Sequence, residues 1–351
     1  MLPQRVWMRE TPLPSVSVIV PAWNAAATIE RTLRSIADQT LSPDEIIVVD
    51  DGSTDATADI VRSWGDRDPR FKLMRQSNQG PVAARNAAIA YSAGALLAPV
   101  DADDIWRPEY LERMTAALER DPAAGFVYCL YRGIDEDDRA LQDGGDFGCE
   151  GRVLLQHLLV NFVGNGSCAV FRREALLAAG GFDPEAETWG GAEDYLLQLR
   201  IAATARVARV GDRLVGYRRS TGSYSARAPS RNLRARLAAI DRVMAESSVA
   251  EPGIRRLATA DALRTTAARL AISGRWIQAL GYGLRAFGRD APGILQDLRI
   301  RIDNALGRLR PSQREGLGMS FLDLDPSVSV GPPVDPLTLR RLARLQAREP
   351  G

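Results

Sequence analysis

Short apolar runs alternate with segments of helical periodicity through the first part of the chain. The apolar runs predict buried strands at Val16 to Val20, Glu45 to Val49, Phe71 to Met74, Ala95 to Val100 and Phe126 to Tyr131. The periodic segments predict helices over Ile29 to Ala37, around Ile60 to Trp64, from Pro81 to about Ser92, and with Pro108 in a first turn. This alternation indicates an α/β fold with a doubly wound, mostly parallel, Rossmann-like sheet. Ligands of such sheets bind at the carboxyl ends of the strands.

The pattern changes in the second half of the chain. Residues 133–164 are irregular and rich in Asp and Gly, apart from a helix expected at Val153 to Val160. After Arg227, Ala, Leu and Arg recur with helical spacing through about residue 310, with a hairpin turn at Ser273 to Trp276. Residues 311–336 are rich in Pro, Ser and Gly and are expected to be loosely ordered, and a basic helix is expected over 337–348.

These changes predict four regions. They are an N-terminal tail (1–14), an α/β domain (15–227), a C-terminal α-helical extension (228–310) and a Pro-rich tail with a short basic helix (311–351).

Composition restricts the class of partner and the compartment. Lys plus Arg number 45 against 44 for Asp plus Glu, so no bulk positive field favours nucleic acid, and no nucleic-acid partner is expected. Cys129, Cys149 and Cys168 are odd in number and widely spaced, which favours a reducing compartment. The N-terminus lacks the apolar run of a signal peptide, and no stretch approaches the ~18 apolar residues of a membrane span. A cytoplasmic protein is expected, at most attached to the inner face of a membrane.

An acidic cluster follows the predicted strand that ends at Val100. In extended backbone, alternate side chains point the same way, so Asp101 and Asp103 can present two carboxylates to one point. Such hard oxygen ligands suit Mn²⁺ or Mg²⁺. A solvated loop is the alternative reading, and the position at a strand's carboxyl end favours the metal site.

A second acidic segment, Asp50-Asp51-Gly52-Ser53, follows the strand that ends at Val49. These residues all favour tight turns, which is one interpretation. The other is that a carboxylate accepts hydrogen bonds from a nucleobase, since uracil offers an N3 donor. If the sheet is parallel, both acidic segments converge on one crevice.

Five segments in order closely resemble the motifs of glycosyltransferase family 2. They are SVSVIVPAWN (15–24), EIIVVDDGSTD (45–55), NQGPVAARNAAI (78–89), PVDADDIWRPEYL (99–111) and WGGAEDYLLQLRIA (189–202). The resemblance covers about residues 15–225 and implies the GT-A fold. It also implies inverting transfer of a sugar from a nucleotide diphosphate to a hydroxyl-bearing acceptor. Residues 15–131 would then form the nucleotide-sugar half and 132–227 the acceptor half.

By this resemblance, seven residues form the donor and metal site. They are Pro21, Ala22 and Trp23 in the base pocket, Asp51 on the base, Arg85 near the base or diphosphate, Asp101 on the ribose or metal, and Asp103 as the principal metal ligand. On the acceptor side, Asp194 matches the general base, while Glu193 and Trp189 are candidates for acceptor contacts. Trp189 could equally be a packing residue, and Glu193 could only pair with an arginine.

The chain departs from the family at one position. Many relatives carry a histidine shortly after the base motif, where this sequence has Tyr217-Arg218-Arg219-Ser220-Thr221. The only histidine in the chain, His157, fits a structural helix position better. Arg218 or Arg219 could supply the missing contact. The Gln-X-X-Arg-Trp mark of processive synthases is absent after the base, which favours addition of single sugars.

The sequence therefore predicts a metal-dependent glycosyltransferase of the hexosyltransferase type. A UDP-sugar is the favoured donor, GDP and dTDP sugars stay open, and the acceptor is expected to be a saccharide or lipid-linked saccharide. The alternative is a non-catalytic nucleotide-sugar-binding module of the same fold. A nucleotidyltransferase would need a glycine-rich basic loop near its N-terminus, which this sequence lacks. The basic residues of 340–348 keep peripheral contact with an anionic membrane as a hypothesis.

Overall fold

The computed structural model describes residues 13–219, 229–247, 251, 253–292, 295, 318–329 and 336–348. The expected tail over residues 1–12 and the end of the expected helical region, beyond residue 295, lie outside the described residues.

The first part of the chain alternates strands with helices, as predicted. The elements are β1 (Val16–Ala22), α1 (Ile29–Ala37), β2 (Glu45–Asp50), α2 (Thr57–Gly65), β3 (Phe71–Arg75), α3 (Pro81–Tyr91) and β4 (Leu96–Pro99). The strands are parallel in the order β3-β2-β1-β4, with β1 between β2 and β4. Because helices cover both faces, the centre of β1 is fully buried, with Val18, Ile19 and Val20 each at 0% exposure.

The rest of the domain adds strands of both directions. Its elements are β5 (Ile105–Trp106), α4 (Tyr110–Arg120), β6 (Ala124–Ile134), β7 (Ala140–Asp143), α5 (Leu154–Leu159), η1 (Gly166–Cys168), β8 (Ala169–Arg172), α6 (Arg173–Ala178), α7 (Glu185–Trp189), α8 (Glu193–Thr204) and β9 (Arg206–Arg218). The sheet runs β3-β2-β1-β4-β8-β6-β9-β5, with β7 paired to β6. β8 is antiparallel to both β4 and β6, and β5 is antiparallel to β9. The α/β class is confirmed, but the sheet is mixed rather than mostly parallel.

Pro108 lies in the turn before α4 and not in its first turn. The helix begins at Tyr110, and the Pro108 carbonyl accepts a hydrogen bond from the Thr40 amide at 2.8 Å. The prediction was wrong by the length of this turn, because proline fits a turn as well as a helix start.

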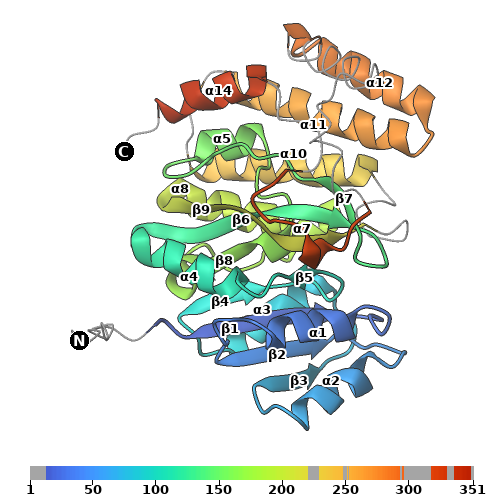
Figure 1. The fold of residues 1–351 in the computed structure, drawn as a ribbon. Coiled ribbons are helices and arrows are strands. Elements are labelled where there is room, and N and C mark those ends of the chain that lie inside the picture. Colours follow the sequence, from blue (N-terminus) through green and yellow to red (C-terminus); the bar gives the residue numbers. More distant parts are fainter. Residues whose placement is uncertain are drawn as a thin grey trace, which may run out of the picture.

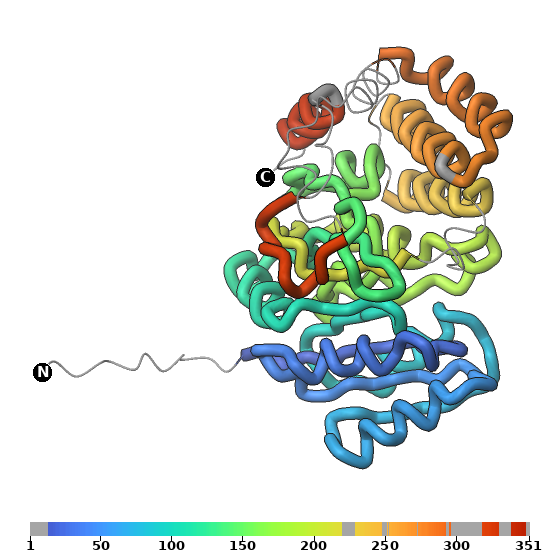
Figure 2. The backbone as a smooth tube through the Cα atoms, turned by 45° about the vertical axis from the view of Figure 1, so that its right-hand side comes forward, coloured from blue at the N-terminus to red at the C-terminus, as the bar shows by residue number. Residues whose placement is uncertain are grey.

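A helical region follows the α/β domain. It comprises α10 (Pro229–Glu246), α11 (Ile254–Ile272) and α12 (Trp276–Phe287), and the turn between α11 and α12 falls where the hairpin was predicted. α10 packs on α8, and α11 contacts both α10 and α5. In Figures 1 and 2 these helices lie at the opposite end of the molecule from β1, β2 and β3. No helix in the described part of the chain is long and apolar enough to cross a membrane.

The described part of the Pro-rich tail is docked, which corrects the expectation of loose order. Residues 318–329 include η3 (Phe321–Asp323) and run beside β7 (Figure 1). Phe321 is fully buried in a small cluster with Ile105 and Ile134. Arg107 donates from Nη1 to the carbonyls of Phe321 (2.9 Å) and Leu324 (2.8 Å). Side-chain patterns do not predict this docking, because the partners of Arg107 are main-chain carbonyls.

The final helix, α14 (Pro336–Gln346), forms where a basic helix was expected. Leu342 and Leu345 are buried, and the helix packs against α5. Gln346 donates to the main-chain carbonyls of Glu150 and Arg152.

Candidate active site

One large cleft collects the acidic side chains that the sequence singles out. It has a volume of about 2070 Å³ and lies at the carboxyl ends of β1, β2 and β4. Asp51, Asp101, Asp103 and Asp194 all line it. The opposite wall comes from residues 160–166 and from α10 and α11. Side chains up to 143 positions apart in sequence, from Asp51 to Asp194, therefore face one space.

Asp51 is held rigidly at the end of β2. Its Oδ1 accepts hydrogen bonds from Gln76 Nε2 (2.7 Å) and the Gln79 amide (2.9 Å), and its Oδ2 accepts one from the Gly80 amide (2.8 Å). A carboxylate offers about four acceptor positions, so one remains on Oδ2. The position of Asp51 is fixed by protein donors while an acceptor position stays open.

The N-terminus of α3 forms the adjoining floor of the cleft. Glu187 of α7 accepts a hydrogen bond from the Val82 amide at 3.0 Å, so two carboxylates, Asp51 and Glu187, satisfy the first amides of α3. A side chain at Gly80 would meet Glu187 Oε1 at 2.5 Å, and Gly80 has φ +90°. Glu187 was missed by the sequence analysis, because only the fold shows that α7 packs there.

Pro21, Ala22 and Trp23 line the cleft at the end of β1, next to Asp51. Trp23 is 59% exposed, which leaves its ring accessible to a planar ligand. The loop that carries it is tied to the loop after β2, since the Asn24 amide donates to Ser53 Oγ at 2.9 Å.

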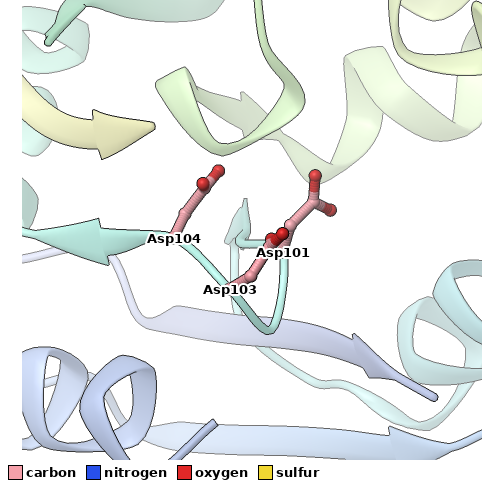
Figure 3. Close-up of side chains that lie close together, drawn as sticks. All are labelled: Asp101, Asp103 and Asp104. Carbon is pink, nitrogen blue, oxygen red and sulfur yellow. The ribbon is translucent and has the colours of Figure 1, made fainter. Parts of the chain in front are cut away.

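Asp101, Asp103 and Asp104 follow one another on the loop between β4 and β5 (Figure 3). One carboxylate oxygen from each lies within 4.8 Å of the others. Burial and the charge of Asp101 raise the pKa of Asp103 to about 6, against the opposing charge of Arg218. Two carboxylates held this close repel each other unless a cation lies between them, so the loop suits a divalent ion.

Asp104 has a different environment from the other two aspartates. It is fully buried, and its Oδ2 accepts from Asn165 Nδ2 (2.8 Å) and Ser167 Oγ (2.6 Å). Its Oδ1 accepts from the Arg218 amide at 2.9 Å. These bonds occupy the carboxylate, so Asp104 positions the loop rather than facing the cleft. The sequence analysis missed this role, which only its contacts reveal.

Arg218, a candidate for the missing histidine's place, supports the same loop. Its guanidinium donates to the main-chain carbonyls of Asp103 (2.8 Å, from Nε) and Asp135, and it pairs with Asp138. The side chain is 3% exposed. The Arg218 side chain therefore supports the acidic loop by binding the main chain of Asp103.

Arg85 joins the donor and acceptor sides of the cleft. Its Nη2 lies 2.6 Å from Asp101 Oδ1, and its Nη1 lies 2.7 Å from Glu193 Oε1. The Arg85 side chain is 8% exposed. Glu193 is thus paired with an arginine, one of the two possibilities for this residue.

Asp194 stands in the first turn of α8. The chain enters this helix through Gly190, Gly191 and Ala192, which all have positive φ (101°, 119° and 72°). The Tyr195 amide donates to Asp194 Oδ1 at 2.7 Å. Burial and the neighbouring charge of Glu193 raise the pKa of Asp194 to about 7, with Arg85 opposing. A carboxylate with this pKa can take up a proton near neutral pH.

Two further residues lie away from this chemistry. Trp189 packs against the hydrophobic core and is not among the described residues that line the cleft. His157 is fully buried in α5, bonded through Nε2 to Gln198 Oε1 at 3.2 Å, and burial lowers its pKa to about 3. His157 is therefore structural, as the sequence analysis favoured.

Solved structures with this arrangement identify the class of fold. Staphylococcus aureus TarS 1–349 in complex with UDP-GlcNAc matches with a TM-score of 0.58 at 23% identity, covering 84% of this chain and 88% of that chain. Mannosyltransferase PcManGT from Pyrobaculum calidifontis, in complex with GDP-Man and Mn²⁺, matches with a TM-score of 0.55 at 24% identity, covering 86% and 82%. The fold is that of GT-A glycosyltransferases.

Sequence comparison points to the same class. Residues 17–178, just under half of the chain, match the family model described as Glycosyl transferase family 2. A Bacillus subtilis (strain 168) protein with the provisional name glycosyltransferase EpsH is 39% identical over 132 residues, 37% of either chain. The chain spans about half or less of the length of the curated relatives it matches.

Proposed function

We propose that this protein is a metal-dependent, inverting glycosyltransferase. It transfers one sugar from a nucleotide diphosphate sugar, with UDP as the favoured nucleotide, to a hydroxyl acceptor in bacterial polysaccharide or glycoconjugate biosynthesis. The observation that carries the proposal is the convergence of Asp51, the Asp101–Asp103 pair and Asp194 on one cleft.

The carboxylate ligands on the loop after β4 fit Mn²⁺ or Mg²⁺. Asp103 and the free oxygen of Asp101 would hold the ion, because the carboxylate of Asp104 is engaged by protein donors. Bound there, a divalent cation would stabilise the negative charge that develops on the departing diphosphate. Arg85 holds Asp101 in place through the 2.6 Å ion pair.

The open acceptor position on Asp51 suits the N3–H of uracil, with the exposed ring of Trp23 and the edge of Pro21 beside it. The neighbours' complexes include both UDP-GlcNAc and GDP-Man, so the fold accommodates either base. A panel of UDP, GDP and dTDP sugars read by thermal shift with Mn²⁺ tests the preference. A ligand at 100 times its Kd stabilises by about 2.7 kcal/mol.

Asp194 is proposed as the general base. It would accept the proton of the acceptor hydroxyl as that oxygen attacks the anomeric carbon opposite the diphosphate. Its pKa of about 7 keeps it partly ionised at neutral pH and allows it to hold the proton afterwards. Glu193, paired with Arg85, would keep the first turn of α8 in place.

Release of UDP from a panel of UDP-sugars with Mn²⁺ tests the function. The parent is expected to release UDP, and Asp194→Asn to release it far more slowly. If no donor is turned over and Asp194→Asn binds donors like the parent, the non-catalytic binding module is the better description.

Peripheral contact with an anionic membrane is also kept as a proposal. On α14, Arg341 pairs with Asp290 and Arg348 with Glu251, which leaves Arg340 and Arg344 as the exposed basic side chains of this helix for lipid headgroups. Co-sedimentation with phosphatidylglycerol vesicles should fall when residues 336–351 are deleted. Unchanged co-sedimentation would remove the contribution of this helix.

A further inference from the structure

The cleft does not end at Asp194. It continues to a wall formed by one face each of α10 and α11, which we call the α10–α11 wall. Its charged lining residues are Arg231, Arg236, Asp261, Arg264 and Arg269. Among the described residues of this wall, four arginines thus face the cleft with one acid.

The wall lies directly beside the proposed base. Arg231 packs on Gly190 so closely that a Cβ there would meet Arg231 Cγ at 2.1 Å. The Arg236 guanidinium carbon lies 6.0 Å from the centre of the Tyr195 ring. Gly190 and Tyr195 flank Asp194 in the chain, so both arginines contact the segment that carries the proposed base.

The positive charge of the wall is only partly compensated. Asp261 pairs with both Arg236 (2.9 Å) and Arg264 (2.7 Å), so one carboxylate serves two guanidinium groups. Arg269 lies further along α11, also lines the cleft and is exposed. By formal charge, the described lining residues of the wall comprise four arginines and one aspartate, so this side of the cleft is basic.

The donor does not account for this charge. In the proposed function the diphosphate lies at Asp101 and Asp103, on the loop after β4. α10 packs on α7 and α8, on the side away from β1 and β2 (Figure 1). The cleft is therefore acidic on the side of the strands and basic on the side of α10 and α11. A guanidinium group recognises phosphate and carboxylate oxygens through paired hydrogen bonds.

We propose that the acceptor carries an anionic group, a phosphate or a carboxylate, close to the hydroxyl that receives the sugar, and that the α10–α11 wall binds that group. This inference rests on the proposed function, because it assigns the charge to the acceptor. The wall would orient the acceptor so that its hydroxyl meets Asp194, and neutral saccharides would bind more weakly.

Matched small probes test the proposal on the full chain saturated with UDP and Mg²⁺, which occupies the diphosphate site. The probes are glycerol 3-phosphate against glycerol, and methyl glucuronide against methyl glucoside, with binding followed by ligand-observed NMR. Each anionic probe that fits should bind at least about tenfold more tightly than its neutral partner, and added salt should weaken it. A preference limited to phosphate or to carboxylate supports the proposal and identifies the group.

The test variant combines Arg231→Gln with Arg269→Gln. Its control combines Arg275→Gln with Arg289→Gln, two exposed arginines that are not among the described lining residues, and removes the same charge. The test variant should lose the anion preference by at least about tenfold, and the control should keep it. Equal binding of anionic and neutral probes by the parent, or equal losses in both variants, would overturn the proposal.

Acceptor-independent UDP release separates this test from the proposed function. The control variant and the parent should release UDP at similar rates, since neither Arg275 nor Arg289 is among the described residues that line the cleft. If both release UDP and no anion preference exists, only the anionic acceptor is wrong. If the parent releases no UDP from any donor, the proposed function fails, and a measured anion preference then describes a binding site only.

Discussion

The main-chain N–H of Arg218 donates a hydrogen bond to Asp104 Oδ1 at 2.9 Å. This bond joins the end of β9 to the acidic loop after β4. The Arg218 guanidinium strengthens the link by donating to the Asp103 carbonyl. Arg218, one of the two arginines that could supply the contact of the missing histidine, thus holds the acidic loop in shape.

Asp103 and Asp104 should respond differently to substitution. Asp104→Ala leaves the Arg218 amide, Asn165 and Ser167 without their buried acceptor and should lower the free energy of unfolding by more than about 2 kcal/mol. Asp103→Asn should change stability little and abolish the Mn²⁺-dependent part of donor binding. Urea unfolding and donor titrations with and without Mn²⁺ measure both. The same loss of stability in the two variants would contradict the division of roles.

Arg85 should matter for both stability and geometry. Arg85→Gln leaves Asp101 and Glu193 without their shared cation and should cost up to about 3 kcal/mol, the low end for a broken buried pair, because Asp101 remains 36% exposed. Chemical denaturation measures this cost. A second variant, Arg85→Gln with Glu193→Gln, removes one of the two stranded charges and should recover part of the loss. No recovery would indicate that Glu193 is solvated in the single variant.

The docked segment 318–329 depends on Arg107, whose guanidinium donates to the carbonyls of Phe321, Leu322 and Leu324. Arg107→Gln should release this segment, seen as faster hydrogen exchange over residues 319–324 with the rest of the domain unchanged. Arg113→Gln breaks only a surface pair with Asp212 and is the control. Equal protection in the parent and Arg107→Gln would show that the burial of Phe321 alone holds the segment.

The first half of the fold could be predicted because its strands are buried on both faces and read as continuous apolar runs, such as β2. β8 and β9 gave no such signal. β8 has four residues, and β9 carries arginines whose charges are balanced by distant acids, as in the pair of Arg213 with Asp143 at 2.6 Å. β8 is also antiparallel to both of its neighbours, and an antiparallel strand needs no helical crossover, so the alternation of strands and helices does not reveal it.

Part of the candidate site could likewise be predicted from the sequence, and part could not. Asp51, Asp101, Asp103 and Asp194 could be singled out because each belongs to a local motif. The supporting contacts of Asp104 and Glu187, and the α10–α11 wall, depend on which distant segments pack together. No local pattern contains that information.

The pH dependence of transfer offers a test of Asp194 itself. A general base must be ionised, and burial together with the charge of Glu193 raises the pKa of Asp194 to about 7. Transfer should therefore fall about tenfold per pH unit below pH 7 and level off above it. Asp194→Asn should be slower by about 10² to 10⁴ and should lack this acidic limb, while exposed Asp59→Asn should behave like the parent.

The same reasoning predicts the effect of a neighbour. Glu193→Gln removes the negative charge that raises the pKa of Asp194 and frees Arg85 to stabilise the carboxylate, so the inflection should move to lower pH. The measurement is kcat/KM for transfer between pH 5 and 9. Mn²⁺ is kept saturating because the bound ion keeps the metal-binding carboxylates ionised. An inflection that stays near pH 7 in Glu193→Gln, or persists in Asp194→Asn, would assign the titration to another group and remove Asp194 as the base.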